Sequence, residues 1–208
     1  MSDQSVFQPK QQRSQDTQRK LINALHHCLQ HKFFEHISIK EIAEHAGVSV
    51  GTFYRRFKDK ESLLPLLYQD FGDDLHQWLE KLEAQQFNNL TETVRQTCQQ
   101  TFEFLDDKRS VFRTIHLNSR LHENLISPEE RIDRKQVYKR IANIYMRFEQ
   151  EISAPDKQQA AENSVFILIS ALLDKVLYPD LTPAIACDAD AIAMAVELPE
   201  MILPYLKR

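Results

Sequence analysis

The sequence predicts an all-α protein of about nine helices, and three observations lead to this fold class. The 208 residues include only three glycines, whereas average usage would give roughly 15. Apolar residues recur at helical spacing through most of the chain, and we find no strand pattern or internal repeat. Proline residues and Asn or Asp pairs separate the periodic stretches. So few glycines also exclude the glycine-rich loops that bind phosphate in nucleotide-binding proteins.

The N-terminal segment changes from polar to amphipathic within the first 30 residues. Residues 1–15 are polar and rich in glutamine, and we expect a disordered arm there. A helical pattern follows, for which Asp16 or Thr17 is the predicted N-cap. Its apolar face is formed by Leu21, Ile22, Leu25 and Leu29.

Two short helices and the start of a fourth helical segment follow the first helix. Ser38 and Glu41 have the spacing of a capping box, which predicts a helix that ends at Gly47. Ser49 is the predicted cap of a third short helix, and Asp59 that of a fourth helical segment.

Longer helices are predicted for the rest of the chain. Asn-Asn, Asp-Asp, Ser-Pro and Ala-Pro pairs separate them, and Pro199 and Pro204 make the last one irregular. The predicted helices are Leu63–Leu82, Leu90–Leu105, Ser110–Leu125, Pro128–Ile152, Lys157–Leu177 and Ala189–Leu206.

Charge is distributed unevenly along the chain. The net charge is −4, yet residues 1–60 carry +4 and the remainder carries −8. A basic N-terminal part on an acidic body indicates two roles, and the basic part favours a nucleic-acid partner.

The cysteines and apolar runs predict the compartment. Cys28, Cys98 and Cys187 are far apart in the sequence, which gives no disulfide framework and fits a reducing compartment. The N-terminus lacks the apolar segment of a signal peptide. The longest apolar run, Val165–Leu173, is far shorter than the ~20 residues that span a bilayer. We therefore expect a cytoplasmic protein without a membrane segment.

The segment from Ser38 to Leu64 has the pattern of a helix-turn-helix motif. Ala43 is small enough to let two helices approach closely. Gly47 can adopt a backbone conformation that a side chain opposes, and Val48 fills the gap between the helices. Gly51 would allow the start of the second helix to come close to another surface, and a helix N-terminus attracts phosphate.

This motif resembles the DNA-binding motif of the TetR (tetracycline-repressor) family, whose pattern runs approximately A-G-V-S-x-G-T-x-Y-x-x-F-x-x-K-x-x-L. The resemblance covers about the first third of the chain and includes Arg19, Ile22 and Ala24 in the first helix. Two departures are Arg56, where the family often has His, and Lys32–Phe34, where a glycine is common. The matching motif residues are Ala46, Gly47, Val48, Ser49, Gly51, Thr52, Tyr54, Phe57, Lys60 and Leu63.

The resemblance implies a DNA-binding domain over residues 16–62 and a helical ligand-binding and dimerisation domain over residues 63–208. Val50, Thr52 and Arg55 are the candidates for contacts to base edges, because Arg can bond guanine and the methyl groups can meet thymine. Gly51 would permit close approach to the DNA. The candidates for phosphate contacts are Ser38, Lys40, Tyr54, Arg56 and Lys60.

The second domain contains candidates for a small-molecule site, although most of its aromatic residues must belong to the core. Arg113, His116 and Arg120 share one helix face. They could bind an anionic ligand, form an ion pair with another helix, or simply face solvent. The resemblance implies an inducer cavity among these helices, and no cofactor. The candidate ligand-binding residues are Phe102, Phe112, Arg113, His116, Arg120, Tyr138 and Tyr145.

The stretch Val165–Leu173 is apolar on every side of its predicted helix, which indicates complete burial or pairing with another helix. The resemblance implies that the last two helices form a four-helix interface in a homodimer. The candidate interface residues are Phe166, Ile169, Leu172, Leu173, Val176, Met201 and Ile202.

Two other clusters of polar residues are explained more simply by helix structure than by metal binding or catalysis. His26, His27, Cys28 and His31 could suggest a metal site, but a partly exposed first helix with Cys28 in the core explains them as well. Adjacent carboxylates such as Asp106 and Asp107 point apart on a helix. We expect neither a metal site nor a catalytic site, and therefore no enzyme.

These features predict a sequence-specific, DNA-binding transcriptional regulator. The leading hypothesis is a homodimeric repressor that binds a palindromic double-stranded operator and is released by an unidentified small molecule. A second hypothesis is an activator, or a regulator without a small-molecule inducer. The third is an enzyme or metal protein built on a helical bundle.

Overall fold

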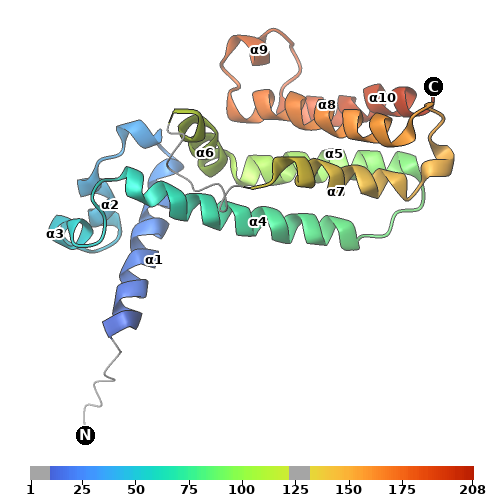
Figure 1. Cartoon of the computed structure of the whole chain (residues 1–208). Coiled ribbons are helices and arrows are strands. Elements are labelled where there is room, and N and C mark those ends of the chain that lie inside the picture. The colour runs from blue at the N-terminus through green and yellow to red at the C-terminus, as the bar shows by residue number, and fades with distance from the viewer. Residues whose placement is uncertain (1–9, 122–131) are drawn as a thin grey trace, which may run out of the picture. The chain divides into compact units, whose positions relative to one another are not determined.

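A computed structural model describes residues 10–121 and 132–208, and all regular secondary structure in these ranges is helical (Figure 1). The predicted all-α fold is confirmed. None of the helices described is long and apolar enough to cross a membrane. The α-helices are α1 (Lys10–Leu29), α2 (Ile39–His45), α3 (Val50–Tyr54), α4 (Leu64–Ala84), α5 (Leu90–Asp107), α6 (Arg109–Leu121), α7 (Arg134–Met146), α8 (Lys157–Leu177), α9 (Thr182–Ile185) and α10 (Ala191–Leu206).

The described residues form two compact units. The first contains residues 10–70 and 114–121, and the second contains residues 71–113 and 132–208. Helices α4 and α6 each contribute residues to both units. The first unit extends beyond residue 62, the domain boundary expected from the sequence, because α4 groups with it as far as Asp70.

In the first unit, α1 packs against α2, and α2 packs against α3. Helix α1 begins at Lys10, so the expectation of a disordered arm is wrong for residues 10–15, and Asp16 and Thr17 lie inside the helix. Thr17 instead donates its hydroxyl to the Arg13 carbonyl oxygen, 2.8 Å away. The added turns contain polar residues with good helix propensity and no Gly or Pro, so they extend the helix into solvent. Residues 1–9 lie outside the described part.

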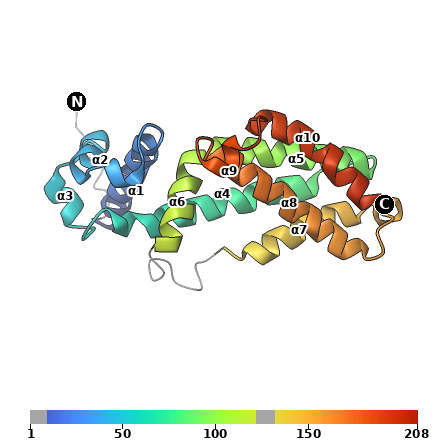
Figure 2. The same ribbon diagram turned by 90° about the horizontal axis from the view of Figure 1, so that it is seen from above.

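In the second unit, α5, α7, α8 and α10 pack around one core (Figure 2). Helix α5 contacts the other three, and α8 also contacts α7 and α10. Helix α7 is shorter than predicted, because Asp133 caps its start by accepting a hydrogen bond from the Gln136 amide at 3.0 Å. The remainder of the predicted helix includes a short 3-10 helix at Glu149–Glu151. The predicted residues 122–125 and 128–131 lie outside the described part.

Arg140 of α7 and Arg147, the residue that caps its C-terminal end, fix this helix to the end of α4. Arg140 forms a bidentate ion pair with Glu83, with nitrogen–oxygen distances of 2.7 and 2.5 Å. The Arg140 guanidinium holds the pKa of the Glu83 carboxyl below its ordinary value. Arg147 donates hydrogen bonds to the backbone carbonyls of Glu83 and Gln85. These bonds satisfy carbonyl groups that the end of a helix leaves without partners.

A buried lysine organises the connection between α8 and α10. Lys175 is 8% exposed, and its ammonium donates to the backbone carbonyls of Ala184 and Cys187. This connection contains the short helix α9, which the sequence analysis did not predict. Neighbouring Leu181 and Ile185 remain more than half exposed.

Candidate nucleic-acid interface

The start of α2 is held by the predicted capping box. The Glu41 amide donates to the Ser38 hydroxyl at 3.2 Å, and the Ser38 amide donates to the Glu41 carboxylate at 2.9 Å. Lys32 also pairs with Glu41. The Lys32 ammonium and then the two Ser38 donors hold the pKa of Glu41 at about 2. The helix is thereby tied both to its own first turn and to the segment that follows α1.

The turn between α2 and α3 requires the glycine that the sequence places there. Gly47 has a φ angle of 66°, which L-residues with side chains rarely adopt. A Cβ atom at this position would have no neighbour within 4 Å, so backbone conformation rather than space selects glycine. The Val48 amide then donates to the Ala43 carbonyl at 2.9 Å, and Ala43 itself is buried. The turn therefore brings α3 against α2 as the motif predicts.

Helix α3 has one buried and one exposed face. Ser49 caps it by accepting a hydrogen bond from the Thr52 amide at 3.1 Å. Phe53 is completely buried, and its ring centroid lies 5.5 Å from that of Phe57. On the other face, Val50 is 38% exposed and Tyr54 is 56% exposed. Val50 and Tyr54, at i and i+4, are thus both presented to solvent on a helix that is anchored on its opposite side.

Gly51 lies on the exposed part of α3. A Cβ atom there would meet only the Ser49 hydroxyl oxygen, at an ordinary contact distance of 3.8 Å. Its φ angle is not positive. Nothing in the described part of the fold therefore requires glycine at this position.

A chain of hydrogen bonds orients the predicted base-reading residues. Arg55 donates from Nη2 to the Thr52 hydroxyl oxygen at 2.8 Å, and the Thr52 and Ser49 hydroxyls lie 2.9 Å apart. The sequence analysis assigned Thr52 and Arg55 to bases separately and missed this connection. Their spacing of three residues, in a segment predicted to be helical, was the available signal.

Four of the five predicted phosphate contacts differ in how exposed their side chains are. Lys40 is exposed and has only a weak pairing with Glu44 at 3.8 Å. Tyr54 is exposed, and Arg56 is partly buried. Ser38 is exposed, but its hydroxyl donates to Glu41 as part of the capping box.

Lys60 has a structural role that differs from the predicted phosphate contact. Its ammonium donates to the backbone carbonyls of Phe34, Glu35 and Ile37 at 2.8, 3.0 and 3.2 Å. It also lies 4.8 Å from the centroid of the Phe34 ring. All three donors of the ammonium are used, which leaves none for phosphate in this arrangement. The sequence could not reveal this, because the carbonyls lie more than 20 residues away along the chain.

The histidine cluster lies between α1 and α2. The His27 ring centroid is 5.5 Å from that of His31 and 4.8 Å from that of His45. Cys28 is 7% exposed, as expected for a core residue, and burial raises the pKa of its thiol. In the second unit, burial raises the pKa of the Cys98 thiol to about 12, so this thiol stays protonated at neutral pH.

The predicted ligand residues of the second unit differ in their surroundings. Phe112 stacks on Phe71 with centroids 4.7 Å apart, and Phe102 is partly buried against the core. Tyr145 has no exposed surface and is a core residue, so burial raises its pKa well above the ordinary value. Tyr138, in contrast, lines a surface groove.

The remaining predicted ligand residues lie on α6. His116 and Arg113 are partly buried, whereas Arg120 is exposed. Arg120 Nη1 lies 3.1 Å from His116 Nδ1.

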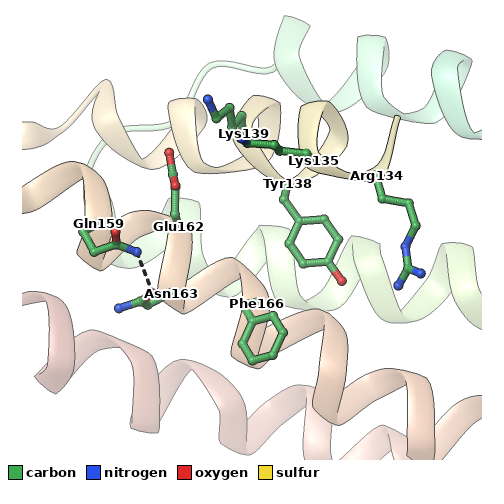
Figure 3. Close-up of a pocket in the computed structure, with 8 residues that line it drawn as sticks. All are labelled: Arg134, Lys135, Tyr138, Lys139, Gln159, Glu162, Asn163 and Phe166. Carbon is green, nitrogen blue, oxygen red and sulfur yellow. Dashed lines mark hydrogen bonds between the residues drawn. The ribbon is translucent and has the colours of Figure 1, made fainter. Parts of the chain in front are cut away.

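The groove between α7 and α8 was not predicted. It has a volume of about 430 Å³ (Figure 3). Its lining residues are Arg134, Lys135, Tyr138 and Lys139 from α7, and Gln159, Glu162, Asn163 and Phe166 from α8. The signal for this groove in the sequence was the close succession of three basic residues, Arg134, Lys135 and Lys139.

The predicted dimer-interface residues divide between the core and the surface. Leu172, Val176 and Ile202 are fully or almost fully buried in the core of the unit, so their prediction as interface residues is wrong. Helices α5, α7 and α10 pack against α8 and bury one side of it, whereas Phe166 and Ile167 stay exposed. Ile169 and Leu173 are partly buried. The large apolar side chains that remain exposed on α8 and α10 are Phe166, Ile167, Ile192, Val196 and Met201.

Comparison with known proteins identifies the first unit. Residues 21–67 match the family model of the bacterial regulatory proteins of the tetR family. The HTH-type transcriptional regulator YxbF of Bacillus subtilis (strain 168) is 31% identical over 103 residues, which cover 48% of this chain and 26% of the relative. The motif is thus a helix-turn-helix domain of the kind found in bacterial transcriptional regulators. More specifically, the chain carries the helix-turn-helix domain of the tetR family.

Solved structures extend the likeness to the whole fold. The TetR-family regulator PfmR from Thermus thermophilus has a TM-score of 0.61 over 90% of this chain and 99% of its own, with 18% identity. Salmonella enterica GusR has a TM-score of 0.57 over 92% and 96% of the two chains, also with 18% identity. At this identity the likeness concerns the fold.

Proposed function

We propose that this protein is a sequence-specific DNA-binding transcriptional regulator, and that it acts as a homodimeric repressor released by a small molecule. The observation that carries the DNA-binding role is the exposed face of α3. Its opposite face is anchored by Phe53, its start is capped by Ser49, and Gly51 leaves room for an approaching surface. The match of residues 21–67 to a family of regulatory proteins supports the same role.

In this proposal α3 enters the major groove. Thr52 holds the Arg55 guanidinium, which can bond guanine, while Val50 presents methyl groups that can contact thymine. Lys40, Tyr54 and Arg56 contact phosphates, which position the domain without reading sequence. Lys60 supports the domain from inside and does not take part in binding.

The second unit supplies the dimer contact. Helices α8 and α10 pack against each other, and both expose large apolar side chains outside the groove, namely Ile167 on α8 and Ile192, Val196 and Met201 on α10. Burial of these side chains against a second copy of the chain would remove an apolar surface of the kind that marks interaction sites. Two DNA-binding units would then meet successive major grooves about 34 Å apart on a palindromic operator.

Release by a ligand requires that the ligand binds one conformation of the dimer better than another. A small molecule that prefers a conformation with a different separation of the two DNA-binding units would reduce DNA affinity by that preference. We place this function in the second unit, which contains the groove and the aromatic residues around Phe112.

In vitro selection from random duplexes, followed by fluorescence anisotropy, tests the proposal. We expect a palindromic consensus that the wild-type protein binds more tightly than a shuffled duplex. Arg55→Ala should reduce this preference, whereas Arg95→Ala, a matched change at an exposed arginine of α5, should not. Failure to enrich any sequence would contradict sequence-specific binding.

Salt dependence provides a second measure of the contact. If Lys40 and Arg56 of both subunits reach phosphates, four phosphates are neutralised and the slope of log affinity against log salt is near −4. A slope close to zero would show that these cations do not lie on the DNA backbone.

A further inference from the structure

The groove between α7 and α8 combines positive charge with aromatic surface. Arg134, Lys135 and Lys139 contribute three cations, and Glu162 is the only acidic residue among its lining side chains. Within residues 10–121 and 132–208, no hydrogen bond or ion pair engages any of these three cations. Their charges are therefore available to a ligand.

This positive charge is unusual for its surroundings. Residues 61–208 carry a net charge of −8, so most of this part of the chain repels anions. The single carboxylate of the groove, Glu162, already accepts a hydrogen bond from the Gln158 side chain at 2.9 Å. A local excess of cations in an acidic domain favours an anionic ligand over a cationic one.

Two aromatic side chains complete the groove. In Figure 3 the Tyr138 ring extends from α7 toward Phe166 on α8, and the Arg134 guanidinium lies on the side of the Tyr138 hydroxyl. Phe166 remains 60% exposed. A planar ligand can lie against these rings while its acidic group meets the guanidinium, which binds carboxylates and sulfonates through two parallel donors.

The α8 side of the groove is fixed by hydrogen bonds. Gln159 donates to Asn163 at 2.9 Å, and Asn163 donates to the Tyr205 hydroxyl of α10 at 2.9 Å. Arg140, on the same helix as Tyr138, anchors α7 to α4. Because both walls are held by other helices, the groove is formed before a ligand arrives, as is usual for small-molecule sites.

We propose that the α7–α8 groove binds a small aromatic organic anion, with Arg134 on the acidic group and Tyr138 against the ring. Its volume of about 430 Å³ falls in the range of small-molecule pockets and accommodates one or two fused rings. A role for this anion in releasing DNA rests on the proposed function, but binding to the groove does not.

Fluorescence titration tests the groove with two probes of similar shape. Anilinonaphthalene sulfonate is an aromatic anion, and phenyl-naphthylamine is a neutral counterpart. We expect Arg134→Gln to weaken binding of the anionic probe about tenfold, as expected for loss of a charge-assisted contact, and to leave the neutral probe little changed. Tyr138→Leu should weaken both probes. Lys81→Gln, which removes an exposed cation on α4, is the matched control and should affect neither.

The proposal is overturned if the wild-type protein does not bind the anionic probe, or if Arg134→Gln leaves its affinity unchanged. Equal weakening of both probes by Arg134→Gln would also overturn it, since the guanidinium would then not recognise charge. Circular dichroism of each variant excludes loss of fold as the cause. Anisotropy with the selected duplex, on the same samples, separates the two proposals. Probe binding without DNA binding supports the proposed ligand groove and contradicts the proposed DNA-binding function. DNA binding without probe binding contradicts only the proposed ligand groove.

Discussion

Arg55, which caps the C-terminal end of α3, is held by a hydrogen bond from its guanidinium to the Thr52 hydroxyl of that helix, 2.8 Å away. Thr52 in turn lies 2.9 Å from the Ser49 hydroxyl, which caps the helix. The cap of α3 is thus connected to the side chain that we assign to base recognition. An arginine that is oriented before binding loses less rotamer freedom when it meets a base.

Replacement of Thr52 by valine keeps the shape of the side chain and removes this support. We expect Thr52→Val to weaken specific DNA binding by about 1 kcal/mol, the usual contribution of one hydrogen bond, or roughly fivefold. Binding to random DNA should change less. Thr52→Ser retains the hydroxyl and is the matched control. Anisotropy on the selected and shuffled duplexes measures both, and an equal loss on the two duplexes would show that Thr52 acts on the DNA backbone instead.

Lys60 should act on stability rather than on DNA affinity. Lys60→Met removes three hydrogen bonds to the carbonyls of Phe34, Glu35 and Ile37, and we expect a loss of about 2 kcal/mol in the free energy of unfolding. The protein that remains folded should bind DNA with nearly unchanged affinity. Lys40→Met, at a cation that is 76% exposed, should do the opposite. Urea denaturation and anisotropy on both variants decide between these roles.

The stabilisation from Glu41 should depend on pH in the acid range. The pKa of Glu41 is lowered to about 2 in the folded protein, whereas an unfolded glutamate titrates near 4.3. Its charge therefore adds stability that is complete above the unfolded pKa and disappears as the pH falls toward 2. Glu41→Gln should be less stable than the wild type at neutral pH, and the difference should shrink below pH about 4. Thermal unfolding at several pH values measures it, and a constant difference would mean that the carboxylate charge does not contribute.

Local signals in the sequence predicted the first unit well. The capping box of Ser38 and Glu41, the left-handed Gly47 and the cap at Ser49 are each determined by residues a few positions apart, and the structure contains all three. What could not be predicted depends on distant residues. The role of Lys60 is fixed by carbonyls that lie beside it only after folding.

Helix α8 shows the same limit on a larger scale. Its apolar residues surround the helix, so periodicity could not distinguish the side that faces the core from the side left exposed. The positions of α5, α7 and α10 make this choice, burying Leu172 and Val176 while Phe166 remains exposed. The groove beside Phe166 likewise requires two helices to come together.

This division of α8 leads to a sharp test of the dimer. Val196→Glu on α10 or Ile167→Glu on α8 places a charge on exposed apolar surface outside the groove, so each variant should fold but should become monomeric. Operator binding should then fall steeply, because one DNA-binding unit loses the effective concentration that its linked partner provides. Leu172→Glu should instead unfold the second unit, because that side chain has no exposed surface.

Gln96→Glu adds the same charge to an exposed position on α5 and should change neither assembly nor DNA binding. Sedimentation velocity, circular dichroism and anisotropy on the same samples separate these outcomes. Folded dimers of Val196→Glu and Ile167→Glu that bind the operator normally would place the interface on another surface. The exposed side chains of α8 and α10 would then need a different partner.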